Sequence, residues 1–133
     1  MAPDPCRPAR RAGERGSAAV EFALVAPLVI AIALLVLQVA LAVHVRTTLI
    51  AAAAEGARAA ALAGAPLQAG EQRARALLEG NLAEGLVTDV RAERGVEDGQ
   101  LVTSVTVQAR LPLLGLLGVT TMRVTGHAIQ ERA

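Results

Sequence analysis

The chain has 133 residues, of which 53% are hydrophobic and 19% charged, and its mean hydropathy of +0.46 is high for a soluble protein of this size. A net charge of +1 gives no strong attraction to nucleic acid, and a single aromatic residue, Phe22, provides no platform for stacked bases. The single cysteine, Cys6, excludes an intrachain disulfide. We therefore expect one small domain with a membrane segment and no nucleic-acid partner.

Residues 1–16 are a polar leader that we expect to be disordered, because prolines alternate there with charged residues. An apolar run from Phe22 to Val43 follows, and Gln38 is its only polar residue. The run is longer than the roughly 20 residues that a helix needs to cross a bilayer. It is also longer than the roughly 7–15 apolar residues of a cleaved secretory signal. The sequence therefore predicts a transmembrane helix at residues 17–45.

The arginines around this span predict its orientation. Arg46 is the only basic residue close to the far end of the span, whereas the leader contains Arg7, Arg10, Arg11 and Arg15. The positive-inside rule places the more basic flank in the cytoplasm. We therefore expect a single-pass protein of the cytoplasmic (inner) membrane, with its N-terminus in the cytoplasm and residues 46–133 exported.

Two further features of the span have alternative interpretations. Small residues recur along one helical stripe, which would let a second helix approach closely in lipid; they are Ala19, Ala23, Ala26, Ala33 and Ala40. Alanine is common throughout the chain, however, so the stripe can also reflect composition alone. Pro27 either kinks or locally loosens the helix, or is simply tolerated there.

Beyond the membrane the pattern predicts a helical continuation from Thr47 to Ala63, ended by the Gly64-Ala65-Pro66 segment. Its small-residue face could lie closely on a sheet and comprises Leu49, Ala53, Gly56, Ala60 and Ala63. A second helix is predicted from Leu67 to Glu84. Its expected buried side consists of Ala74, Leu77, Leu78 and Leu82.

The remainder predicts strands. Residues 86–92 are a weak candidate, followed by a turn ending at Glu97-Asp98-Gly99. A half-buried strand is indicated by strict alternation, with one face formed by Leu101, Thr103, Val105, Val107 and Ala109. A last strand alternates in the same way, with one face formed by Met122, Val124, Gly126 and Ala128. The apolar connection from Leu111 to Gly118 could cover the sheet edge or dock on another subunit.

These elements predict an α+β fold, in which a long N-terminal helix is half in the membrane and half packed on a small antiparallel sheet. The stretch ERGSAAVEFALVAPL places Gly16 and Ser17 just before Glu21 and Phe22 at the start of the apolar run. It resembles the start of TadE-like minor pilins (pseudopilins) of the Flp/Tad type IV pilus family. That family is cut after a glycine, with glutamate at the fifth mature position and an aromatic residue next. The EGARAAA segment, residues 55–61, and the C-terminal hairpin extend the resemblance over most of the chain.

The resemblance implies a type IV pilin-like fold and cleavage between Gly16 and Ser17 by a prepilin peptidase. It also implies partners among other pilin and minor pilin subunits, the Tad assembly machinery and membrane lipid, in a Tad pilus or a related secretion apparatus. The sequence leaves open whether the subunit enters a surface pilus or only primes its assembly.

The chemistry of this motif can be argued from the residues alone. Cleavage after Gly16 would create an α-ammonium group on Ser17, and Glu21 would then lie four residues on, on the same helical face and near the positive end of the helix dipole. The carboxylate could neutralise its own N-terminus or that of a neighbouring subunit, and the resemblance favours the neighbour. Alternatively, Glu21 merely favours a helix start at the membrane interface.

Other functions remain as alternatives. The chain could be an unprocessed single-span signal-anchor protein of the envelope, whose exported domain binds a partner. An enzyme or metal-binding protein is not indicated, since no nucleophile–base order or nucleotide-binding fingerprint is present, and His44 and His127 have no cysteine or spaced carboxylate cluster beside them. We therefore expect no catalytic residue, cofactor, metal or small-molecule substrate.

Overall fold

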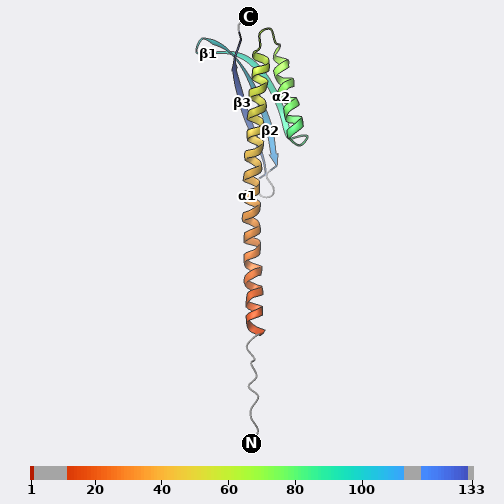
Figure 1. The fold of residues 1–133 in the computed structure, drawn as a ribbon, viewed down its shortest axis with the longest axis vertical. Coiled ribbons are helices and arrows are strands. Elements are labelled where there is room, and N and C mark those ends of the chain that lie inside the picture. Colours follow the sequence, from red (N-terminus) through yellow and green to blue (C-terminus); the bar gives the residue numbers. More distant parts are fainter. Residues whose placement is uncertain (2–11, 113–117, 132–133) are drawn as a thin grey trace. The chain divides into compact units, whose positions relative to one another are not determined.

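The computed structural model of the chain describes residues 1, 12–112 and 118–131. Its elements are, in chain order, α1 (Ala12–Ala61), α2 (Leu67–Asn81), β1 (Val87–Glu97), β2 (Gln100–Pro112) and β3 (Val119–Ile129) (Figure 1). The chain divides into two compact units, residues 1–37 and 38–133, and α1 contributes to both. Helices followed by an antiparallel sheet make an α+β fold, as the sequence predicts.

In the first unit, α1 is helical from Ala12 and continues through Pro27. Residues 12–16 are thus helical, where the sequence predicted disorder. The prediction was wrong because it considered the leader's composition alone, whereas an established helix extends by one turn at little cost. The rest of the predicted leader, residues 2–11, lies outside the described residues.

In the second unit, α2 and the part of α1 from Gln38 onward pack on one face of the sheet (Figure 1). The strand order is β1-β2-β3, and both pairs are antiparallel. The core lies between the helices and this face, and α1 supplies mostly small residues to it. Its buried members are Val45, Leu49, Ala52, Ala53, Ala57, Ala74, Leu78, Val90, Ala92, Val105, Val107, Ala109 and Leu111.

The alternation predicted for the strands is largely confirmed. On β2 the side chains of Thr103, Val105, Val107 and Ala109 are buried. Leu101, expected on the same buried face, is 54% exposed. The prediction failed there because Leu101 pairs with the exposed Val96 beside the hairpin turn, beyond the buried part of the sheet.

The outer strands also follow the period of two. On β3, Gly126 is buried and Met122, Val124 and Ala128 are half-buried, whereas the alternate residues are exposed. The weak strand predicted at residues 86–92 becomes β1, which continues to Glu97. Of the predicted apolar connection, Leu111 is a buried residue of β2, and residues 113–117 lie outside the described part.

The turn predicted after Glu97 joins β1 to β2. Asp98 and Gly99 both have positive φ, 49° and 76°, and Glu97 pairs directly with Gln100. A two-residue hairpin whose central residues both have positive φ matches the twist of the flanking strands. This turn therefore fixes the register of the β1–β2 pair.

The helix ends differ slightly from prediction. α1 ends at Ala61 and not at Ala63, and Ala63 is exposed, although the predicted break at residues 64–66 is confirmed. α2 ends at Asn81 and not at Glu84, since the backbone of Leu82 is extended and its N–H bonds the carbonyl oxygen of Leu78. On α2, Ala74 and Leu78 are buried, whereas the predicted Leu77 and Leu82 are only half-buried.

Three glycines allow the helices and the sheet to lie very close together. A Cβ atom on Gly126 of β3 would lie 2.5 Å from the backbone carbon of Ala53 in α1. A Cβ on Gly56 of α1 would lie 2.7 Å from the carbonyl oxygen of Gly70 in α2. Any side chain at these positions would overlap backbone, so the spacing of α1, α2 and β3 depends on them.

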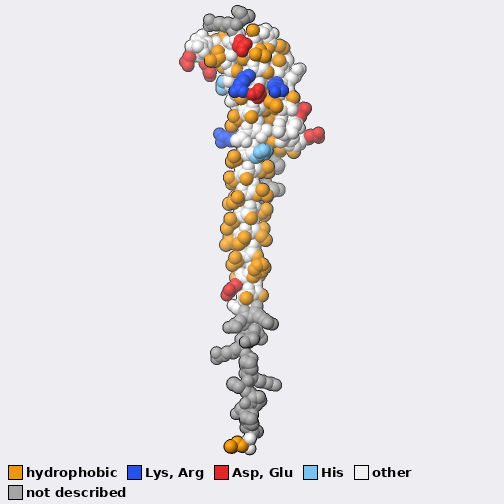
Figure 2. All heavy atoms as spheres, viewed as in Figure 1, with side chains coloured by type: hydrophobic (Ala, Val, Ile, Leu, Met, Phe, Trp, Pro, Cys, Tyr) orange, Lys and Arg blue, Asp and Glu red, His pale blue; other side chains and the backbone are white. Residues whose placement is uncertain are grey.

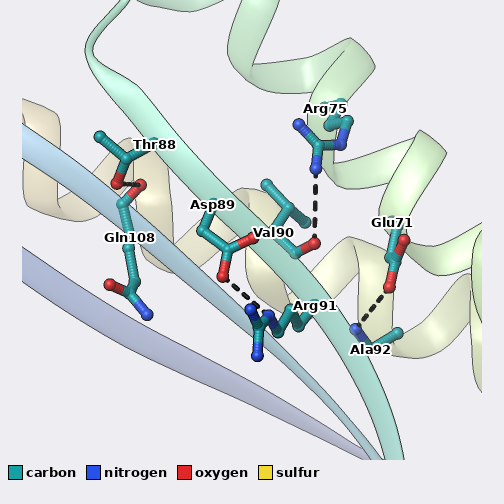
Figure 3. A network of polar contacts seen from close by, with 8 residues as sticks. All are labelled: Glu71, Arg75, Thr88, Asp89, Val90, Arg91, Ala92 and Gln108. Atoms are coloured by element: carbon teal, nitrogen blue, oxygen red, sulfur yellow. Dashed lines mark hydrogen bonds and ion pairs between the residues drawn. The ribbon is translucent and has the colours of Figure 1, made fainter.

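Two side chains of α2 bind the outer backbone edge of β1 (Figure 3). The N–H of Ala92 donates to Glu71 Oε1 at 3.0 Å, and Arg75 Nη2 donates to the carbonyl oxygen of Val90 at 3.5 Å. These groups point away from β2, so α2 supplies the partners that a further strand would otherwise supply. The centre of the β1 edge is therefore covered.

Candidate processing and assembly site

The motif residues lie together at the start of the apolar part of α1. Ser17 and Glu21 are four residues apart and so share a helical face, and the Ser17 hydroxyl donates to Glu21 Oε1 at 3.3 Å. Both side chains are exposed, as is Phe22, at 73%. The proximity of Ser17 and Glu21 that the spacing predicted is present.

Gly16 precedes this pair and has open space around it. A Cβ added there would meet no atom within 4 Å. The described part of the chain therefore gives no packing reason for glycine at position 16.

The helix that follows the motif has the properties of a membrane span. Its most apolar 18-residue window has a mean hydropathy of 2.8, and none of that window is buried inside the protein. Hydrophobic side chains cover the face of this part of α1 that Figure 2 shows. Leucine, valine and isoleucine side chains between Val20 and Val43 are about half exposed or more. An all-round apolar helix without internal partners needs lipid or other helices around it.

The five alanines of the predicted stripe lie on this same segment. Ala26 is half-buried by its own helix, and Ala19, Ala23, Ala33 and Ala40 are exposed. The stripe is therefore accessible to a neighbouring helix, and its role in helix packing stays a prediction.

Polar groups where the apolar segment ends are satisfied within the helix. The hydroxyl groups of Thr47 and Thr48 both donate to the carbonyl oxygen of His44, at 2.9 and 3.0 Å.

Among the described residues, no group of three or more His, Cys, Asp or Glu side chains could hold a metal ion. His44 and His127 have no ligand cluster there.

Sequence reasoning missed the contacts of Glu71 and Arg75 with β1. Both residues have the pattern of solvent-facing helix positions, and their partners are backbone groups 21 and 15 residues away in the sequence. A helix predicted next to an edge strand is the one signal that could have raised the question.

Comparison with known proteins addresses the N-terminal part. A family model described as TadE-like protein matches residues 16–58. Residues 16–58 are therefore TadE-like. The match begins at Gly16, includes the apolar helix and ends within the alanine-rich segment that packs on the sheet. No curated protein and no solved structure matches the chain.

The match supports a Tad pilus-associated protein. Together with the long apolar helix, it indicates a single-pass membrane protein. Residues 16–58, the TadE-like segment, thus contain the Gly16–Phe22 motif, the apolar span and most of the small-residue face of α1.

Proposed function

We propose that the chain is a TadE-like minor pilin, or pseudopilin, which is cut after Gly16 by a prepilin peptidase and contributes to assembly of a Tad pilus or a related secretion apparatus. The observation that carries this proposal is the coincidence of three features. The family match begins at Gly16, the Ser17–Glu21 contact follows it directly, and next comes a helix whose most apolar window is not buried by the described part of the protein.

The proposed cleavage by a peptidase is supported by the glycine at the end of the leader, Gly16. Gly16 offers no side chain, so the backbone around it can be accommodated in a narrow protease cleft once the local helix opens. Because Gly16 has no close neighbours in the fold, opening this turn breaks no tertiary contact of the glycine. Cleavage would leave Ser17 as the first residue, with Glu21 one helical turn away.

The proposed role in assembly is supported by the charge of Glu21, which lies at the start of the apolar segment. A carboxylate beside hydrocarbon is costly unless it has a partner. The α-ammonium group of Ser17 in a neighbouring subunit would be such a partner, and the apolar helices would pack around the pair. The exposed alanine stripe would allow close approach of a neighbouring helix.

The proposal places the chain in the cytoplasmic membrane with its N-terminus in the cytoplasm and residues 46–133 exported. The arginines of the leader support this orientation through the positive-inside rule. The alternative is a signal-anchor protein that keeps its leader and binds an envelope partner.

The N-terminus of the mature protein distinguishes the two. The chain is produced with and without a prepilin peptidase, purified from membranes and measured by intact mass and N-terminal sequencing. We expect a chain that starts at Ser17 only when the peptidase is present. Residues 1–16 still attached in peptidase-containing cells would contradict the proposal and favour the signal-anchor alternative.

A further inference from the structure

The two edges of the sheet differ in how their backbone groups are satisfied. On β1, Glu71 and Arg75 bind the outward groups of Ala92 and Val90. Directly after β3, the N–H of Gln130 donates to the carbonyl oxygen of Leu101 in β2, and this bond fixes which residues of β3 direct their backbone towards β2. Residues of even number on β3 therefore bond β2, and those of odd number direct their backbone outward.

The outward-directed residues of β3 include Thr121, Arg123, Thr125 and His127. Within the described part of the chain, no hydrogen bond reaches their backbone groups from any helix or loop. Past the end of the strand, the N–H of Glu131 donates to the carbonyl oxygen of Ala61 in α1. An exposed strand edge of this length is a ready template for a further strand.

We propose that the β3 edge binds an extended strand of a different polypeptide, which adds a fourth strand to the sheet. This inference rests in part on the proposed function, because the membrane anchor enters the argument about the occupant. Strand addition obtains affinity from main-chain hydrogen bonds and specificity from alternate side chains.

A second copy of the chain does not fit this edge. Antiparallel pairing of two β3 strands would reverse the direction of one β3 relative to the other, and would reverse α1 with it, since α1 packs on the same sheet. Residues 38–43 of α1 belong both to this unit and to the apolar span. Two chains anchored in one membrane with the same orientation could not both satisfy that arrangement.

The other homotypic pairings are also unfavourable. Pairing β3 with β1 of a second copy would require Glu71 and Arg75 to leave Ala92 and Val90. A symmetric parallel pair of β3 strands would bring equivalent residues opposite each other, which the slanted bonds of a parallel ladder do not accommodate. A strand from a different chain has none of these conflicts.

The side chains beside the edge indicate the chemistry of that strand. On the outer face, Arg110 and Arg123 are exposed and no acid lies on the β2 or β3 part of this face. On the inner face, Met122 and Val124 are only half-buried. The occupant should therefore alternate apolar residues, which extend the inner face, with polar residues that include at least one acid near Arg123.

Thr125 provides a matched pair of variants. Its hydroxyl hydrogen bonds to that of Thr106, and its backbone N–H points outward. Thr125→Pro and Thr125→Val both remove the hydroxyl contact, but only proline removes the outward N–H and places a ring where the new strand would lie. Thr125→Val is thus the control for any effect of the lost hydroxyl.

The test is hydrogen exchange of the full-length chain, measured by mass spectrometry in detergent and in native membranes that contain the complete assembly apparatus. We expect fast exchange in detergent for the outward amides of Thr121, Arg123, Thr125 and His127. In the assembled state their exchange rates should be lower by a factor of about ten or more. The Thr125→Pro chain should lose this protection at Arg123 and His127 and the Thr125→Val chain should keep it, with both variants equally protected on β2.

Three results would overturn the inference. Outward amides that stay fast in a chain that is processed and co-assembled would show a free edge, and would leave the proposed function intact. Protection in detergent that increases with protein concentration would identify a second copy as the occupant. Equal protection of the Thr125→Pro and Thr125→Val chains would show that the edge backbone is not what is bound.

Discussion

Gly56 and Gly70 face each other where α1 crosses α2, each against the backbone of the other helix. A Cβ on Gly56 would lie 2.7 Å from the carbonyl oxygen of Gly70, and a Cβ on Gly70 would lie 2.6 Å from the carbonyl oxygen of Gly56. The two helices are thus separated by little more than backbone atoms. The contact joins the TadE-like segment to α2, which lies outside the family match.

This contact predicts opposite effects for two glycines of one helix. Gly70→Ala should destabilise the second unit, residues 38–133, because overpacking of a close backbone contact costs about 1–3 kcal/mol and exceeds the helix preference of alanine. Gly80→Ala should stabilise it by about 0.5–1 kcal/mol, because a Cβ at Gly80 meets no atom within 4 Å. Pulse proteolysis of the full chain in increasing urea measures both changes, and equal midpoints for the two variants would contradict the prediction.

The start of the domain that follows the span can be tested by truncation. Val45 is 4% exposed and belongs to the core, although the sequence placed it in the transmembrane segment. A fragment from Ala42 to Ala133 should therefore be more stable than one from Thr47 to Ala133, by about 1.5 kcal/mol or more for the buried valine. Thermal unfolding by circular dichroism compares the two fragments. Identical melting temperatures would place the functional start of the domain after Val45.

Gly16→Val should block processing of the leader. A branched side chain restricts the backbone at the cut site and crowds a protease cleft, whereas a Cβ at position 16 meets no atom of the described residues within 4 Å. The leader should remain attached in cells that contain the peptidase, and the variant should still insert in the membrane. Efficient cleavage of the valine variant would contradict the assigned site.

Glu21→Gln should impair assembly while leaving insertion and cleavage intact. Glutamine keeps the size of the side chain but removes the charge, and breaking a buried ion pair by removing one partner costs on the order of 3–5 kcal/mol. Insertion should persist because the segment becomes more apolar. Processing and pilus formation are followed together in cells without the wild-type copy.

Ser17→Ala is the matched control for Glu21→Gln. It removes the hydroxyl that contacts Glu21 at 3.3 Å but leaves the α-amino group created by cleavage. We expect this variant to assemble normally. Loss of assembly in Ser17→Ala cells with normal assembly in Glu21→Gln cells would mean that the hydroxyl matters and the charge does not.

Reporter fusions at the α1–α2 connection should reveal the orientation of the span. A reporter inserted after Ala63, an exposed residue beyond the end of α1, should be active only if it requires export. The leader's excess of arginine is the physical reason. Activity of a cytoplasm-dependent reporter at this position would reverse the topology and with it the proposed pilin role.

Elements with a strong local signal could be predicted from the sequence. The alternation around Val105 and Val107 identified the buried face of β2, and the small-residue face around Ala53 and Gly56 identified the side of α1 that packs on the sheet. The Ser17–Glu21 contact followed from helical spacing alone. Each of these depends on residues close together in the chain.

Features that depend on distant neighbours could not be predicted. The bonds from Glu71 and Arg75 to β1 require knowing that α2 lies beside that strand. The exposure of Leu101 depends on where the helices end relative to the hairpin. The helical start at Ala12 was missed because composition described the leader without the helix that follows it.

The region where α1 contacts α2 and β3, here called the seam, should respond to mutation differently from the opposite side of the core. Its closest contacts are formed by glycine and alanine, such as Gly56, Gly126 and Ala53, which are already the smallest residues. Truncation can remove at most one methyl group there, from an alanine, and most single-base changes that alter one of these residues add atoms. Random mutagenesis should therefore damage this seam by steric excess, and damage the opposite side of the core, around Leu78 and Val107, by cavities. Natural variation in the seam would keep glycine at positions 56 and 126 and allow only small residues at position 53, while the strand side could drift among aliphatic residues of similar volume.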